Sequence, residues 1–291
     1  MFKKILQSSV HALLNRPKII RLAFFTLLCF SIVRLYYIIY YFNTLLIWKY
    51  ESGVQVSDAL MYFISTLNEH HALLTIIIAI VIIVVGYLWL YPIGQASVIY
   101  ALHQSEDSNF SAFSKGLWRF FPMLEYGGLS IPFGLFTFST VLLRLYLIDV
   151  LGNVMVDILI GIRGVMVLFA SIFRSYAKVI IVLEGKQVFD AIKKSTKIAF
   201  LNLGLSIRLM LVELLLLFRF LFTWALIVGI PLGLIYIAVW LDILDNSFVE
   251  GVIWIVAGAL LLVLSYINCI IETFFLTYWY QAYKIVSQKE E

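Results

Sequence analysis

Long apolar runs constrain the fold of this chain more than any other feature. Several of them exceed the ~20 residues that an α-helix needs to cross the hydrocarbon core of a bilayer. Only 13% of the 291 residues are charged, about half the share found in soluble domains. The sequence also lacks the alternating pattern of membrane strands. It therefore predicts an all-α integral membrane protein, with residues 1–291 forming a single transmembrane domain.

The apolar runs are separated by short gaps whose charges alternate in sign. We expect six transmembrane helices, at residues 19–45, 72–100, 125–149, 154–182, 203–240 and 250–283. Lysine and arginine gather at the N-terminus, in the second and fourth gaps and at the C-terminus, whereas the other gaps are mainly acidic. Because positively charged loops stay in the cytoplasm, both termini are expected there, with the protein multi-pass in the cytoplasmic (inner) membrane.

The fifth run, 203–240, is longer than one straight crossing requires at 1.5 Å per residue. Gly229, Pro231 and Gly233 lie in its second half, and such residues are a common cause of kinks. We therefore expect a kink or break there.

Two charged strips stand out against this apolar background. In QVFDAIKKSTKIAF, residues 187–200, one helical face carries Phe189, Ile192, Thr196, Ala199 and Phe200. The adjoining face carries Lys193, Lys194 and Lys197. The pattern is typical of an amphipathic interfacial helix whose lysines face anionic lipid headgroups, here on the cytoplasmic side. FSAFSKGLWRFF, residues 110–121, aligns with it position by position, with Lys115 and Arg119 as its basic residues.

These strips indicate an internal repeat. The segments that precede them also match, ASVIYAL at 96–102 against AKVIIVL at 177–183, and the chain start offers a weaker third copy. Each unit would contain a surface helix and a helical hairpin, giving possible repeat units 1–102, 110–183 and 187–291. Chance similarity between segments rich in Phe, Ile and Lys is the alternative.

The run SYAKVIIVLEGKQVFDAIKKSTKIAFLN, residues 175–202, carries a family resemblance. An apolar span ends in Glu184, and after a short loop a helix begins with Ala191 and Ser195 in an Ala-x-x-x-Ser pattern. This resembles a broad bacterial family of six-span membrane proteins, mostly of unknown function, related to the membrane domain attached to some glycerophosphodiester phosphodiesterases. The resemblance implies the fold and a role in envelope or lipid homeostasis. No phosphodiesterase domain follows, so that activity is not implied.

Four arginines lie well inside the expected spans, away from their cytoplasmic ends: Arg34, Arg144, Arg163 and Arg219. An arginine near a helix centre costs about 2.5–3.5 kcal/mol on insertion scales, so each requires compensation. Arg34, Arg144 and Arg219 lie at similar offsets in the repeat units and could together bind an anion or a lipid phosphate. Alternatively, each one extends to the outer headgroups or pairs with a nearby acid, such as Asp149 for Arg144.

Glu213 and Glu272 are acidic residues inside expected spans, and Asn268 lies one turn from Glu272. A carboxylate in hydrocarbon has to be neutralised or paired. Two interpretations stay open, a part in proton-coupled transport and a structural bridge between helices.

The sequence contains no phosphate-binding loop, dinucleotide motif, zinc-protease motif or nucleophile elbow. We therefore expect no enzyme, no catalytic residues, no metal site and no cofactor. The basic strips are explained by lipid headgroups, so nucleic acid is not expected as a partner. The favoured function is a lipid- or partner-binding scaffold for envelope maintenance, with membrane lipids and possibly another membrane subunit as partners. The alternative is a small transporter or channel for an anionic or amphipathic solute.

Overall fold

The structure is a computed structural model. It describes residues 2–24, 81, 83–104, 108–134, 137–138, 141–142, 145, 152–240 and 247–288. These residues are helical almost throughout, and none of them lies in a strand. The expected all-α class is confirmed.

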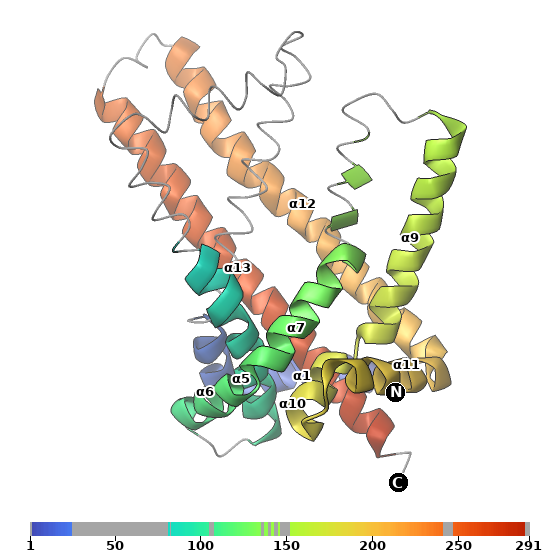
Figure 1. Ribbon diagram of the computed structural model, residues 1–291. Helices are drawn as coiled ribbons and strands as arrows, with labels where there is room; N and C mark the ends of the chain where they lie inside the picture. The colour runs from blue at the N-terminus through green and yellow to red at the C-terminus, as the bar shows by residue number, and fades with distance from the viewer. Residues whose placement is uncertain are drawn as a thin grey trace.

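Three long helices diverge from a cluster of short helices at one end of the molecule (Figure 1). The long helices are α9 (Val154–Arg174), α12 (Leu203–Trp240) and α13 (Ser247–Ser287). The short helices of the cluster are α1 (Phe2–Asn15), α5 (Tyr91–His103), α6 (Asn109–Trp118), α10 (Ala177–Glu184) and α11 (Val188–Leu201). Helix α7 (Phe120–Ser130) rises from the same cluster between the long helices (Figure 1).

The hydrophobic core lies within this cluster. Helices α5 and α10 form its centre, with Pro92–Ile99 and Val179–Val182 buried without interruption. A helix that is apolar on every side is expected to be surrounded by others, and α10 packs against α5, α7, α11 and α13. The last part of α13 passes through the same core, where Tyr278, Ala282 and Val286 are buried.

Two described helical stretches are long and apolar enough to cross a membrane. They are Val154–Glu184 and Gly258–Ser287. Only 11% of the most apolar window of the first stretch is buried by the protein. Its apolar side chains are therefore available to lipid. Val188–Leu201 and Leu203–Leu215 pass the same test together, but they meet at an angle of 104°.

The 104° bend at Asn202 separates α11 from α12, so the two helices run in different directions. Helix α11 extends along the end of the molecule, and α12 leads away from it (Figure 1). A surface helix followed by a crossing helix has this geometry. Helix α6 lies at the same end as α11 (Figure 1), which the expectation of one common side for both strips requires.

Helix α12 is one continuous helix from Leu203 to Trp240, so no break occurs near Gly229–Gly233, and the expected kink there stays a prediction. Apolar helices tolerate proline and glycine when neighbouring groups satisfy the freed backbone. Irregular backbone occurs instead in a π-helix, Ile83–Leu90, and in a 3-10 helix, Ile131–Phe133. Gly134, which follows the 3-10 helix, is extended.

Candidate functional site

The two amphipathic surface helices bury small side chains. Helix α6 buries Ala112 and Gly116, and α11 buries Ala191 and Ser195 at the same four-residue spacing, together with Val188, Ile198 and Ala199. Small residues let helices approach closely. The packed faces of both helices are therefore the small-residue faces rather than the aromatic ones.

Most large aromatic side chains of the two strips point away from the protein. Phe110 and Trp118 of α6, Phe121 at the start of α7, and Phe189 and Phe200 of α11 are between 69% and 84% exposed, whereas Phe113 of α6 is half-buried. They lie beside the basic side chains of the strips, and Lys193 and Lys197 of α11 are also exposed. An exposed aromatic face next to lysines is the surface that an interfacial helix presents to a membrane.

Helix α1 also buries one face and exposes lysines, but its buried apolar residues are aliphatic. It buries Ile5, Ser9 and Leu13 at four-residue spacing. Lys3 and Lys4 are exposed on its other side. The chain start therefore contributes a third basic helix to the same cluster.

The packed faces of α6 and α11 each meet backbone atoms of a segment that precedes the helix in the chain. In α11, Ser195 Oγ donates to the Phe173 carbonyl at 2.6 Å and accepts from the Tyr176 amide at 3.1 Å. In α6, Gly116 packs directly against Ile93 and Ser97 of α5. Ile93 and Phe173 occupy comparable places before the two strips, and the internal repeat stays a prediction.

The remaining basic residues of the strips bind groups within the protein. Lys115 Nζ donates to Gln104 Oε1, and Arg119 Nε donates to Tyr100 Oη at 3.4 Å. The Arg119 guanidinium also lies against Gly185, the αL residue that ends α10. A cation there is favourable because the C-terminal end of a helix carries a partial negative charge.

Glu184 collects several donors at the end of α10. Lys194 Nζ of α11 lies 2.7 Å from its Oε1, and Lys186 Nζ lies 3.2 Å from its Oε2. Tyr283 Oη of α13 donates to the same carboxylate. The cluster links α10, α11 and α13 at the end of the molecule where the surface helices gather.

The two acids inside the expected spans bridge helices. Glu272 of α13 accepts from Tyr91 Oη at 3.0 Å and from Gln95 Nε2 at 3.3 Å. Glu213 of α12 accepts from Trp279 Nε1 of α13 at 3.3 Å. Asn268 lies one turn before Glu272 and is partly buried.

An aromatic and hydroxyl cluster lies beside Glu213, next to its partner Trp279. Tyr176 and Trp279 meet edge to face with ring centroids 5.3 Å apart. Tyr176 Oη lies 3.1 Å from Ser206 Oγ, and Tyr278 Oη donates to the Leu209 carbonyl. These contacts fix α12 and α13 to the α9–α10 connection.

The structure describes the expected arginine cluster only in part. Arg34 and Arg144 lie outside the described residues, and Arg219 lies in α12 at a position whose side chain is not described. Arg163 is exposed on α9. The shared anion site of Arg34, Arg144 and Arg219 therefore stays a prediction.

Arg174, the last residue of α9, has a structural role. Its guanidinium donates to the carbonyl oxygens of Ala170, Ser130 and Phe133 at 2.9–3.2 Å, and Tyr126 Oη donates to the Arg174 carbonyl at 3.1 Å. It thereby ties α9 to the end of α7, where helical carbonyls lack partners. The sequence signal that could have indicated this contact is the interruption of the helix at Pro132–Gly134.

No group of three or more His, Cys, Asp or Glu side chains suited to a metal ion occurs among the described residues. No family model, curated protein or solved structure matches the chain.

Proposed function

We propose that the protein is a non-enzymatic scaffold of the cytoplasmic membrane that binds inner-leaflet lipids through its cluster of surface helices. One observation carries the proposal: α6 and α11 both turn small residues inward and most of their aromatic residues outward, and in α11 the exposed Lys193 and Lys197 lie beside them. Burying the apolar side chains in the interface and placing lysines near anionic headgroups are both favourable.

The contacts of the acids favour this function over the alternative of a transporter or channel. A transporter site needs polar groups that face a hydrated path, usually beside broken helices. Glu213 and Glu272 instead bind Trp279, Tyr91 and Gln95 of neighbouring helices. These bonds stabilise helix packing, which is what a scaffold requires.

We infer six crossings with both termini in the cytoplasm. The described helix bounds follow the expected spans in α9, α12 and α13, and the bend at Asn202 is the geometry that a surface helix before a crossing requires. Reporter fusions after residues 104 and 186 should be active only with a cytoplasmic reporter. Fusions after residues 58, 152 and 245 should be active only with an exported reporter. The reverse pattern at any of these positions would contradict the topology.

Site-directed fluorescence in nanodiscs tests the lipid-facing surface. In a background with Cys29→Ser and Cys269→Ala, an environment-sensitive dye is attached at Phe189→Cys, with Asp190→Cys as the matched control on the next position. We expect spin-labelled lipid to quench the dye at 189, and aqueous iodide to quench the dye at 190. Equal quenching of both positions by iodide would refute membrane contact by α11.

A second measurement tests the lysines. The proposed surface predicts that adding anionic lipid to the nanodisc increases quenching at position 189, and that Lys193→Gln with Lys197→Gln removes this increase. An increase that survives the double substitution would show that these lysines do not attract the headgroups.

A further inference from the structure

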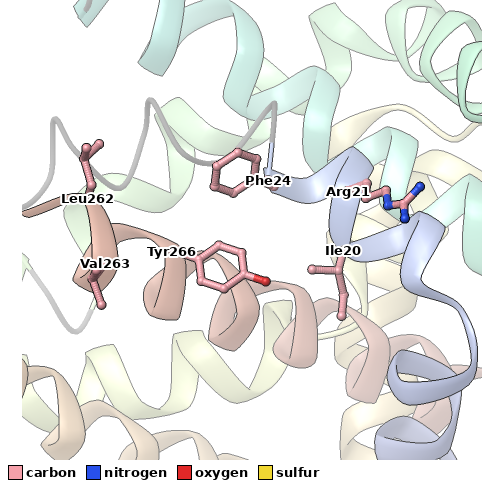
Figure 2. Close-up of a pocket in the computed structure, with 6 residues that line it drawn as sticks. All are labelled: Ile20, Arg21, Phe24, Leu262, Val263 and Tyr266. Carbon is pink, nitrogen blue, oxygen red and sulfur yellow. The ribbon is translucent and has the colours of Figure 1, made fainter. Parts of the chain in front are cut away.

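A groove opens between the N-terminal helical segment 17–24 and α13. Its volume is about 510 Å³, within the range of about 300–1,000 Å³ that small-molecule sites occupy. Figure 2 shows Leu262, Val263 and Tyr266 following one another along α13, with Phe24 facing them. Phe24 and Tyr266 meet edge to face at 5.4 Å between ring centroids. Apolar side chains of α13 and Phe24 therefore line this part of the groove.

The opposite end of the groove is basic. Ile20 and Arg21 line it there, and the Arg21 guanidinium extends away from the apolar side chains (Figure 2). Arg21 is exposed, and among the described residues no carboxylate forms an ion pair with it. The nearest part of the chain offers none, since the first acidic residue in the sequence is Glu51.

The position of the groove matches the depth of a lipid of the inner leaflet. Residues 17–24 lead from basic helix α1 into the first expected span, so Arg21 lies where that span leaves the cytoplasmic cluster. Leu262 and Val263 belong to the part of α13 that extends away from the cluster, and both are exposed. An acyl chain along α13 would place its headgroup beside Arg21.

We propose that this groove holds one anionic phospholipid of the inner leaflet, with an acyl chain against Leu262, Val263 and Tyr266 and its phosphate on Arg21. Arginine donates two parallel hydrogen bonds to a phosphate, which favours it as a headgroup ligand. Lys3, Lys4, Arg16 and Lys18 precede it in a segment without acids, so a net negative headgroup is favoured over a zwitterionic one.

The site deepens the proposed function by naming a lipid class and a fixed binding position. It is distinct from the exposed faces of α6 and α11, so the two ideas fail separately. If the groove binds no lipid, the quenching of a dye at position 189 is unaffected.

Native mass spectrometry of delipidated protein, titrated with phosphatidylglycerol or phosphatidylcholine, tests the site. We expect one phosphatidylglycerol to bind the wild type more tightly than any phosphatidylcholine. Arg21→Gln should weaken that first binding event about tenfold, which equals about 1.4 kcal/mol. Val263→Trp, which fills the groove from an exposed position, should abolish it. Lys4→Gln removes the same charge from α1 and should leave the first binding event intact.

Two outcomes would overturn the proposal. One is a first phosphatidylglycerol that binds Val263→Trp as it binds the wild type. The other is an equal loss of binding in Arg21→Gln and Lys4→Gln, which would indicate general charge attraction without a defined site. Circular dichroism of each variant shows whether its helices are retained, and Arg21→Gln changes only an exposed side chain.

Discussion

Gly116 offers a sharp test of how the surface helix α6 is fixed to the protein. A Cβ atom at this position would lie 2.2 Å from Ser97 Oγ and 2.9 Å from both the Ile93 carbonyl oxygen and the Ser97 amide nitrogen. The Ser97 hydroxyl donates to the Ile93 carbonyl at 2.7 Å, so it is held in place. Two of the three atoms belong to the backbone of α5. Gly116→Ala therefore requires the two helices to separate.

The size of the effect follows from two opposing contributions. Overpacking a close contact costs about 1–3 kcal/mol, and backbone neighbours place this site in the upper part of that range. Replacing glycine with alanine inside a helix returns about 0.5–1 kcal/mol. The expected net loss for Gly116→Ala is about 1–2 kcal/mol in the free energy of unfolding.

The assay is unfolding by titration with a denaturing detergent, followed by tryptophan fluorescence and circular dichroism. Gly128→Ala is the matched control, because it lies in helix α7 with no atom within 4 Å of the added Cβ. It should raise stability by about 0.5–1 kcal/mol. Adding Ser97→Ala to Gly116→Ala removes the nearest atom and should restore part of the loss. Equal stability of the two glycine variants would refute the close approach of α6 and α5.

Three further substitutions test other contacts. Ser195→Ala leaves a backbone carbonyl and an amide without their partner and should lower the free energy of unfolding by about 1–3 kcal/mol. Its control, Thr196→Ala, loses only a bond within α11 and should be nearly neutral in the same titration. Glu184→Gln removes the ion pairs at the end of α10 and should cost about 0.5–1 kcal/mol; this loss should shrink at high salt, and a loss independent of salt would contradict the ion pairs. Arg174→Lys keeps the charge but not the planar fork, so it should cost about 1–2 kcal/mol; full stability in this variant would show that the three carbonyl bonds are dispensable.

Much of the helical organisation could be predicted from local patterns. The run of apolar residues at 203–240 coincides with α12, and the strip at 187–200 coincides with α11 to within one residue at each end. Both features depend on hydrophobicity and helical periodicity, which a single sequence displays directly. The position of the strips at one end of the molecule follows from the same charge pattern.

The packing of those helices could not be predicted, because it depends on segments far apart in the chain. Helical periodicity marks Phe189 and Phe200 as the dominant apolar face, yet the residues packed against the protein include Ala191 and Ser195. Serine gives no hydrophobic signal. Ser195 stabilises the packing through its hydrogen bonds with the Phe173 carbonyl and the Tyr176 amide. Which residue donates to Glu213 likewise depends on where α13 lies against α12.

The positions of irregular backbone could not be predicted from the sequence either. Pro231 marks a break by its chemistry, and α12 nevertheless continues through it. The π-helix Ile83–Leu90 contains no proline and only one glycine. It precedes Pro92 of α5, whose missing amide hydrogen alters the bonding of the turn before it. Its length could not be deduced from composition.

The passage of α13 through the cluster sets an order of events during synthesis. Ile5 and Leu13 of α1 share one core with Tyr278, Ala282 and Val286 of α13, and the two helices pack against each other. Because ribosomes make α13 last among the described helices, α1 has to wait for most of translation before it finds its partner. A nascent chain stalled before residue 270 should leave α1 open to protease, and release of the full chain should protect it. Protection of α1 in the stalled chain would show that another element covers it first.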